Sequence, residues 1–305
     1  MKTISIVIPC FNEEDILKDT IYKLSSLLEN LCNKGLISEK SLIEFVDDGS
    51  TDSTWELIKS FKCNYNIHAL RLSHNKGHQI ALLAGLLEAK DNCDITITLD
   101  ADLQDDIYVI EEMLTKYLNG AEIVYGIRND RSTDRLFKRY SAKAFYKLME
   151  VMGTELIPEH ADFRLLDQTA VEYLSEYDEK NLFLRGIIPQ LGLESDTVYY
   201  KRHKREKGKS KYSLSKMISL AWEGITSMSE KPLQLSIVGS ILCFINGTRL
   251  HFCGFGDNKE INAVRFEMWM LMSLQMLLMS IYGEYAAKTY TEVKGRPRYK
   301  IKERI

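Results

Sequence analysis

Hydrophobic and polar positions follow two patterns in the first part of the chain. Short apolar runs rich in Ile, Val and Leu predict strands, and apolar residues at spacings of three and four predict amphipathic helices. The predicted strands are 4–9, 42–47, 67–72, 95–100 and 122–125, and the predicted helices are 14–31, 53–61, 78–89 and 109–117. This alternation indicates an α/β, Rossmann-like fold, a mostly parallel sheet with helices on both faces. Ligands of such sheets bind beyond the carboxyl ends of the strands.

Longer patterns follow in the second half. Residues 130–150 predict a basic amphipathic helix, and residues 213–229 predict a second helix with one apolar face. Two uncharged apolar segments come next, 232–248 and 268–283. The second is about 24 Å long as a helix, against about 30 Å for the hydrocarbon core of a bilayer. We expect a two-pass membrane hairpin whose flanking cations reach the interface. The alternative is a hairpin that lies on the membrane or packs between subunits.

The distribution of charge changes this picture more than the net charge of −3. Cations gather in 201–216 and 294–304, and the run 201–211 has one acid and no aromatic residue. A solvated loop is the default interpretation of such a run. The missing aromatic side chains disfavour nucleic acid, and the neighbouring apolar segments favour an anionic membrane surface. The six cysteines lack metal-type spacing and are expected to be reduced, cytosolic thiols.

Two carboxylates follow the fourth predicted strand. Asp100 and Asp102 are two residues apart, so an extended backbone would point both side chains the same way. Convergent carboxylates repel each other unless a cation lies between them. Oxygen ligands suit Mg²⁺ or Mn²⁺, which keep open positions for substrate phosphates. A turn with solvated aspartates is the alternative.

The first two strands also end in polar segments. Residues 6–14 read Ile-Val-Ile-Pro-Cys-Phe-Asn-Glu-Glu, and residues 45–52 read Phe-Val-Asp-Asp-Gly-Ser-Thr-Asp. The first offers an aromatic ring and carboxylates for a base and a ribose. Asp48 can accept hydrogen bonds from a base edge, and Gly49 allows a close turn. Helix capping and turn formation are the alternative roles of these residues.

These three segments resemble motifs of glycosyltransferase family 2, which has the GT-A fold. Five segments resemble its polyprenyl-phosphate branch, which includes dolichol-phosphate mannose synthase and undecaprenyl-phosphate glucosyltransferases. They are 75–79 (Asn-Lys-Gly-His-Gln), 100–105 (Asp-Ala-Asp-Leu-Gln-Asp), 125–128 (Tyr-Gly-Ile-Arg), 161–165 (Ala-Asp-Phe-Arg-Leu) and 208–212 (Gly-Lys-Ser-Lys-Tyr). The resemblance covers 3–231 and resumes at 282–299.

The resemblance implies roles for individual side chains. The residues expected at the nucleotide-sugar are Pro9, Phe11, Glu13, Asp48 and Asp100. The metal ligands would be Asp100, Asp102 and Gln104. The acceptor phosphate would be bound by Arg128 and Arg139, with Arg164 and Lys211 as further partners. Asp102 and Asp162 are the expected catalytic residues.

The implied reaction is the metal-dependent transfer of a sugar, with inversion, from a nucleotide-sugar to a polyprenyl phosphate. A phosphomonoester with a second pKa of about 6 is largely ionised at neutral pH. Asp162 is therefore expected to orient groups more than to remove a proton. Two alternatives remain: a glycan or soluble hydroxyl as acceptor, and a nucleotide-sugar-binding or membrane scaffold protein without turnover. The sequence leaves open uridine or guanosine as the base, and the sugar.

The expected organisation has four parts. A GT-A catalytic domain covers 1–205, an interfacial region 206–231, the apolar hairpin 232–285, and a basic tail 286–305. The protein is expected at the membrane with its catalytic domain on the cytoplasmic side. Its expected partners are the nucleotide-sugar donor, the polyprenyl phosphate and the membrane, without nucleic acid. A homo-oligomer is left open.

Overall fold

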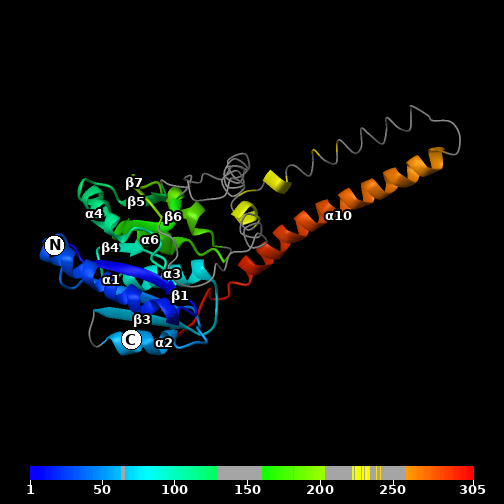
Figure 1. Ribbon diagram of the computed structural model, residues 1–305. Helices are drawn as coiled ribbons and strands as arrows, with labels where there is room; N and C mark the ends of the chain where they lie inside the picture. The colour runs from blue at the N-terminus through cyan, green and yellow to red at the C-terminus, as the bar shows by residue number, and fades with distance from the viewer. Residues whose placement is uncertain are drawn as a thin grey trace.

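The computed structural model (Figure 1) describes residues 1–62, 66–128, 160–180, 182–202, 222, 224–227, 229, 231–233, 238, 241 and 259–305. Its strands are β1 (Ile4–Cys10), β2 (Leu42–Asp47), β3 (Ile67–Leu72), β4 (Ile95–Thr98), β5 (Ile123–Arg128), β6 (His160–Asp167), β7 (Ser195–Tyr200) and β8 (Ile301–Arg304). Its α-helices are α1 (Glu14–Asn33), α2 (Thr54–Lys62), α3 (His78–Ala89), α4 (Ile110–Leu118), α6 (Gln168–Glu176), α7 (Leu184–Ile187) and α10 (Lys259–Val293). The four helices and five strands predicted in the first part of the chain are therefore present.

One eight-stranded sheet organises the chain in the order β7-β5-β6-β4-β1-β2-β3-β8. The neighbours β4, β1, β2 and β3 are parallel, and β5 is parallel to β7. β6 and β8 run against their neighbours. The expectation of an α/β fold with a mostly parallel sheet is confirmed.

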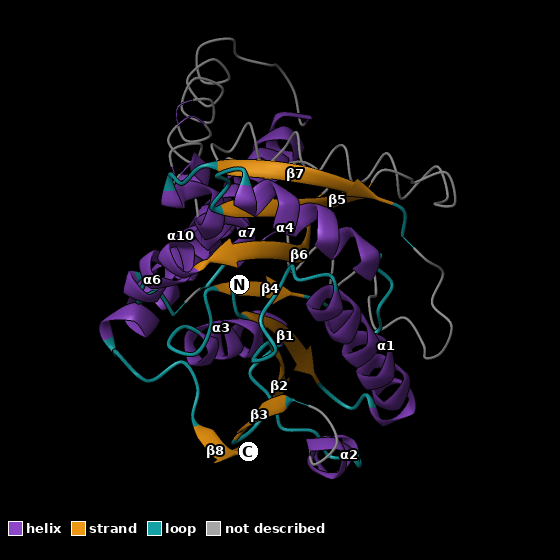
Figure 2. Cartoon of the chain, turned by 90° about the vertical axis from the view of Figure 1, so that its left-hand side faces the viewer, coloured by secondary structure: helices purple, strands orange, loops and turns teal. Residues whose placement is uncertain are grey.

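Helices cover both faces of the sheet, as expected (Figure 2). Apolar residues of α1, α2 and α4 form one core with one face of the strands. Apolar residues of α3, α6 and α7 form the other core. The sheet thus lies between two layers of helices, which buries its apolar runs on both sides.

Helix α3 packs closely on the centre of the sheet because it carries Gly85. A Cβ atom at this position would lie 2.7 Å from Cγ2 of Val46 and in still closer contact with Cγ1 of Val7. Those two valines belong to β2 and β1. The small residue therefore sets how near α3 lies to the strands whose ends form the site.

The end of the described chain returns to the sheet. Residues 286–293, expected in a basic tail, continue α10, and 301–304 form β8 on the edge of β3. The indole Nε1 of Trp55 donates a hydrogen bond of 3.0 Å to Oε2 of Glu303, and the two residues are 248 positions apart in the sequence. β8 pairs its backbone with a strand edge that would otherwise be open.

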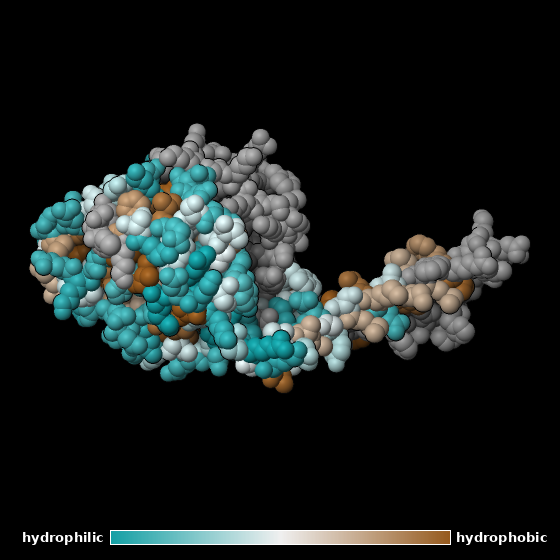
Figure 3. Space-filling view, turned by 90° about the horizontal axis from the view of Figure 1, so that it is seen from below, coloured by the Kyte–Doolittle hydropathy of each residue, from teal (hydrophilic) through white to brown (hydrophobic). Residues whose placement is uncertain are grey.

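Helix α10 projects away from the sheet (Figure 1) and carries many exposed apolar side chains (Figure 3). Those of Met268, Met276 and Met279 are each about two-thirds exposed. Among the residues described, no helix combines the length and apolar character needed to cross a membrane. The expected hairpin is therefore not supported in 268–283, where Ser273, Gln275 and Ser280 interrupt the apolar side chains.

The other elements expected in the second half mostly lie outside the described residues. The basic helix at 130–150 is wholly outside them. Of the amphipathic helix at 213–229, residues 224–227 are described as helical. Of the first apolar segment, 232–248, only residues 232, 233, 238 and 241 are described.

Candidate active site

The polar segments predicted after the first, second and fourth strands meet at one edge of the sheet. β1, β2 and β4 are parallel neighbours, so their carboxyl ends lie side by side. The loops after β1 and β2 are joined by hydrogen bonds. The backbone N–H of Asn12 donates to Oγ of Ser50 at 2.9 Å, and the N–H of Glu13 donates to Oγ1 of Thr54 at 2.9 Å. These contacts fix the segment that begins α1.

The expected nucleoside residues occupy this corner. Pro9 is buried in β1, and Phe11 and Glu13 follow it, half-buried, in the loop. Asp48 is buried, and its carboxylate accepts hydrogen bonds from the backbone N–H groups of Lys76 at 2.7 Å and Gly77 at 2.8 Å. Burial raises the pKa of Asp48, although these two hydrogen bonds oppose the rise. Asp48 therefore holds the turn that begins α3.

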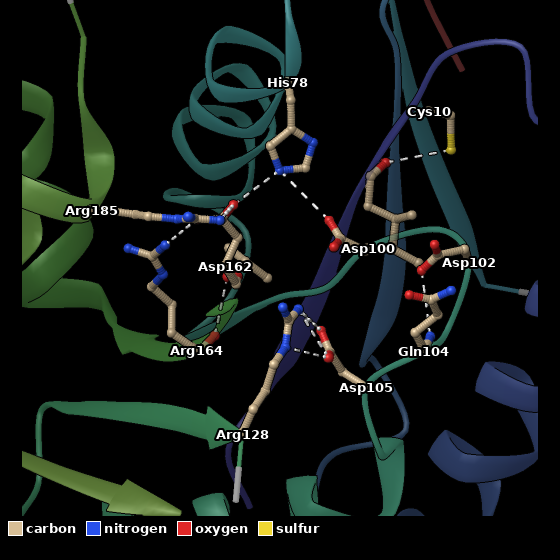
Figure 4. Close-up of polar contacts among 12 residues, drawn as sticks. Cys10, His78, Asp100, Asp102, Gln104, Asp105, Arg128, Asp162, Arg164 and Arg185 are labelled. Atoms are coloured by element: carbon tan, nitrogen blue, oxygen red, sulfur yellow. Dashed lines mark hydrogen bonds and ion pairs between the residues drawn. The ribbon is translucent and has the colours of Figure 1, made fainter. Parts of the chain in front are cut away.

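That turn places His78 at the centre of the site (Figure 4). Gly77 has φ +91°, a conformation suited to glycine, and His78 is the first residue of α3. Nε2 of His78 lies 3.6 Å from Oδ1 of Asp100 and 3.4 Å from Oδ2 of Asp162. Burial alone would lower the pKa of His78, but the hydrogen bond to Asp162 and the two carboxylate charges raise it. His78 thus joins the end of β4 to β6.

Asp162 is held by two arginines as well. Arg185 donates from Nε to Oδ1 at 3.0 Å and from Nη2 to Oδ2 at 2.8 Å. Nη2 of Arg164 donates to Oδ1 at 2.6 Å. Burial disfavours the charged carboxylate, but Arg185, His78 and Arg164 hold the pKa of Asp162 well below its usual range. Asp162 is therefore an ionised anchor for three side chains.

Arg164 differs from its expected role as a phosphate partner. Its side chain has no exposed surface, because it points from β6 into the protein beneath Asp162. Its Nε and Nη1 atoms have no hydrogen-bond partner among the described residues. In this structure the guanidinium balances the charge of Asp162 and does not face solvent.

Arg128 has a carboxylate partner that the sequence reasoning did not assign. Nε of Arg128 lies 3.2 Å from Oδ1 of Asp105, and Nη2 lies 3.3 Å from Oδ2. The side chain of Asp105 is 2% exposed and that of Arg128 is 24% exposed. The expected acceptor role of Arg128 stays a prediction, and any phosphate that it binds would share the guanidinium with Asp105.

The expected metal ligands follow β4, but not in an extended strand. β4 ends at Thr98, residues 101–102 form a turn, and the next residue, Leu103, has φ 43°. Asp100 points toward His78, whereas Oδ1 of Asp102 accepts from the backbone N–H of Gln104 at 3.4 Å. The same-side alternation expected of an extended backbone therefore does not apply here.

The donor chemistry of this turn still fits a hard divalent cation. Asp100, Asp102 and Gln104 offer only oxygen ligands on their acceptor atoms. Burial raises the pKa of Asp100, and the carboxylates of Asp162, Asp105 and Asp102 add to the rise while His78 opposes it. A cation relieves such a concentration of negative charge. Within the described ranges, however, no group of three or more His, Cys, Asp or Glu side chains is arranged to hold a metal.

A cavity of about 500 Å³ opens beside the His78–Asp162 contact. It lies between α3, the segment that includes α7, and the base of α10. The ionisable side chains that line it are Lys76, His78, Asp162, Lys180, Arg185, Glu284 and Lys288. Its lysine and arginine side chains outnumber its carboxylates, so the walls favour an anionic ligand.

No role was predicted from the sequence for His78, Asp105 or Arg185. His78 and Asp105 stand inside segments that carried the family resemblance, so that resemblance could have drawn attention to both. Arg185 had no comparable signal, because only the fold brings α7 to Asp162. The remaining expected acceptor residues, Arg139 and Lys211, lie outside the described residues.

Comparisons with known proteins show the family of the chain. Residues 5–174 match the family described as Glycosyl transferase family 2. The chain is 44% identical to the uncharacterised glycosyltransferase YkoT of Bacillus subtilis (strain 168), over 98% of this chain and 90% of YkoT. It is 37% identical to the bactoprenol glucosyl transferase of Shigella phage SfX, over 99% of each chain. Among solved structures, glucosyl-3-phosphoglycerate synthase from Mycobacterium tuberculosis has 18% identity and a TM-score of 0.48, covering 74% of this chain and 79% of that one.

Proposed function

Because the chain belongs to glycosyl transferase family 2 and is a glycosyltransferase, we propose that it transfers a sugar from a nucleotide-sugar to a polyprenyl phosphate. Its GT-A-like α/β fold agrees with this family. The proposed acceptor is supported by relatives named bactoprenol glucosyl transferase, which match nearly the whole chain at 36–37% identity.

The observation that carries the proposal is the contact of His78 with both Asp100 and Asp162. On the Asp100 side, the strand ends offer the acidic and aromatic groups suited to a metal-bound nucleoside diphosphate. On the Asp162 side, the cavity has cationic walls suited to an acceptor phosphate. The two substrates would therefore meet at His78, with a nucleophilic phosphate oxygen facing the anomeric carbon.

The chemistry needs little proton transfer. A phosphomonoester with a second pKa of about 6 is largely dianionic at neutral pH and is already a nucleophile. The low pKa of Asp162 makes this carboxylate a poor base and a stable anchor. A single displacement at the anomeric carbon would form the new sugar–phosphate bond, break the bond to the nucleoside diphosphate and invert the configuration.

We further propose that Asp100, Asp102 and Gln104 hold Mg²⁺ or Mn²⁺ together with the donor's phosphates. When bound, this cation stabilises the negative charge that develops on the departing nucleoside diphosphate. Two carboxylates with an amide oxygen leave positions for phosphate oxygens, as Mg²⁺ sites commonly do. Helix α1 begins nearby, and Asn12 and Ser50 hold its preceding loop in place for the nucleoside.

Attachment to the cytoplasmic face of a membrane is part of the same proposal. The exposed apolar side chains of α10 and the cations at 201–216 support it, because a lipid phosphate must reach the site while its hydrocarbon chain stays in the bilayer. The protein should then sediment with membranes and resist washing with molar salt, which screens charges within a few ångströms. Release by salt alone would remove the membrane attachment and leave the transferase chemistry standing.

A panel of radiolabelled nucleotide-sugars tests the proposal directly. Each is incubated with the full chain, Mg²⁺ and undecaprenyl phosphate in detergent micelles, and the organic phase is counted after extraction. One donor should give label in the organic phase that mild acid releases as free sugar. Label confined to the aqueous phase, on a glycan or a soluble hydroxyl, would replace the lipid acceptor by the alternative. No transfer from any donor would contradict the proposed activity.

A further inference from the structure

We propose that Lys288 of α10 and Arg185 of α7 bind the phosphate of the lipid acceptor in the cavity beside Asp162. This inference rests on the proposed function and names the subsite in which its acceptor phosphate is held. It also gives helix α10, which lies outside the family match at 5–174, a direct part in substrate binding.

The cavity has the charge of a phosphate site. Lys76, Lys180, Arg185 and Lys288 line it, against the carboxylates of Asp162 and Glu284. Asp162 is already bound by Arg164 and Arg185. Charge complementarity therefore favours an anion with more than one negative charge, such as a phosphomonoester.

Lys288 is positioned rather than left in solvent. Its Nζ donates hydrogen bonds to Oγ1 of Thr226 at 2.6 Å and to Oγ of Ser227 at 2.8 Å. Ser227 lines the same cavity. These two hydroxyl acceptors orient the ammonium group at the wall of the cavity. Lysine binds phosphate well as a point charge of this kind.

Arg185 is oriented by its partner in a similar way. It binds Asp162 through Nε and Nη2, which are on one side of the planar guanidinium. Its side chain is 34% exposed and lines the cavity. Asp162 thus fixes the plane of the guanidinium beside the cavity, so that Arg185 is held in one orientation when a phosphate enters.

The base of α10 is attached to the catalytic domain, so these positions are kept. Both carboxylate oxygens of Glu292 accept from the backbone N–H of Lys180 at 2.9 Å. Arg298 donates to the backbone carbonyl of Tyr177. Residues 177–180, which precede α7, are therefore attached to the end of α10 and to the segment that follows it. A phosphate bound by Arg185 and Lys288 would touch both sides of this junction.

Helix α10 also offers apolar surface beyond the cavity, on which a lipid chain could lie. Lys288 and Leu277 are eleven residues apart on the same helix, about 16 Å at 1.5 Å per residue. Leu277 is 58% exposed and Met276 is 64% exposed. A hydrocarbon chain leaving the cavity would therefore meet exposed apolar side chains along α10. His78 lies on the inner side, so the phosphate would face Asp100 and the donor.

Binding of farnesyl phosphate to the full chain in detergent, measured by calorimetry, tests this subsite without turnover. Lys288→Met removes one charge-assisted hydrogen bond and should weaken Kd about tenfold. Lys288→Arg should restore most of the affinity. Lys294→Met is the matched control: it removes the same charge from the same end of the helix region, outside the cavity, and should leave Kd unchanged. An unchanged Kd in Lys288→Met would overturn the proposal.

A variant that is expected to strengthen binding separates an effect on affinity from damage to the fold. Glu284→Gln removes a negative charge from the cavity wall and should tighten farnesyl phosphate by about threefold. No tightening, in a protein with the wild-type melting temperature, would also count against the subsite.

Two further probes identify what is recognised. Farnesol lacks the phosphate, so its weaker binding should not respond to Lys288→Met. Inorganic phosphate should bind more weakly than farnesyl phosphate and should respond. Equal affinities for the two phosphates would exclude a contribution from the apolar face of α10. Wild-type protein that binds farnesyl phosphate but transfers no sugar would contradict the proposed function and leave the subsite intact.

Discussion

Arg185 and Asp162 form a two-point ion pair, with Nε to Oδ1 at 3.0 Å and Nη2 to Oδ2 at 2.8 Å. The pair connects α7 to β6, beside the cavity. Because the carboxylate also binds His78 and Arg164, its pKa stays well below the usual range. Asp162 is thus suited to orient cations, and a proton acceptor at neutral pH must be sought elsewhere.

The pH dependence of transfer distinguishes an anchor from a base. We expect kcat/KM for the acceptor to fall below about pH 6, where the second proton binds to its phosphate. This acidic limb of the pH profile reflects protonation of the substrate phosphate. The Asp162→Asn variant should therefore keep the limb while lowering the rate at every pH. Measuring both profiles between pH 5 and 8.5 decides the matter, and a limb that disappears in Asp162→Asn would identify Asp162 as the base.

Replacing the arginine tests the geometry of the ion pair. Arg185→Lys keeps the charge but loses the two-point contact, so Asp162 becomes less well oriented. Turnover should fall at least about tenfold, with little change in the donor KM. Arg298→Lys, which alters an arginine of the α10 attachment, serves as the comparison in the same steady-state assay. Equal losses in both would indicate a general structural effect.

Metal dependence follows from the acidic turn after β4. Asp102→Asn should lower turnover by orders of magnitude and leave the melting temperature nearly unchanged, because this side chain is only half-buried. Chelator should abolish wild-type activity, and added Mg²⁺ or Mn²⁺ should restore it. Full transfer in the presence of EDTA would contradict the metal proposal.

Arg128 and Asp105 allow a test of the acceptor role expected from the sequence. If Arg128 binds the acceptor phosphate, Arg128→Lys should raise the acceptor KM about tenfold and change the donor KM little. Asp105→Asn breaks the same ion pair from the other side and supplies the control. Should the two variants lose activity for both substrates alike, the pair is structural.

The close packing of α3 predicts a loss of stability on adding one methyl group. Alanine is favoured over glycine in a helix by about 1 kcal/mol. At Gly85, however, the added Cβ would collide with Val7 and Val46, and overpacking costs about 1–3 kcal/mol. Gly85→Ala should therefore be neutral to destabilising in urea denaturation. The matched change Gly120→Ala, at a position with φ +108° and no atom near the added Cβ, measures backbone strain alone.

A buried glutamate predicts how stability changes with pH. Glu44 in β2 is 1% exposed, and burial raises its pKa to about 8. The folded protein keeps this proton up to about pH 8, whereas the unfolded chain loses it near the ordinary glutamate pKa of 4.5. The contribution of Glu44 to the free energy of unfolding is thus fully present below the pKa of the unfolded chain. It declines by about 1.4 kcal/mol per pH unit as the pH rises toward 8. Glu44→Gln should remove that part of the decline, measured as the difference between the two unfolding curves at pH 6 and 8. Parallel curves would show that Glu44 is ionised when folded.

The hydrophobic pattern predicted the elements that bury apolar runs. β2, β3 and α3 have the predicted bounds because their apolar residues are contiguous or periodic. β6 was not predicted, since its charged residues Asp162 and Arg164 resemble a loop. In the fold Arg164 is buried against Asp162, which Arg185 and His78 also contact. β8 reads Ile-Lys-Glu-Arg, and its strand form depends on pairing with the distant β3.

Site residues could be predicted where they directly follow a strand in the sequence. They could not be predicted where only the tertiary fold brings them together. Asp48, Asp100 and Asp102 were found because they follow strands. Their geometry was not, because the turn at Leu103 replaces the expected extended backbone. The convergence of His78 and Arg185 on Asp162 joins three elements separated in the sequence, and no spacing rule encodes it.

The pairing of β8 with β3 has a consequence for synthesis. β3 is made early, yet the strand that completes its edge, Ile301–Arg304, is made only after α10. Throughout translation of the intervening residues, the outer side of β3 is therefore without its native partner strand and offers backbone groups on which other extended chains can pair. The indole N–H of Trp55, which donates a hydrogen bond to Glu303 in the folded protein, lacks this acceptor until residue 303 has been synthesised. The native edge beside Trp55 can therefore form only at the end of synthesis, when β8 reaches β3.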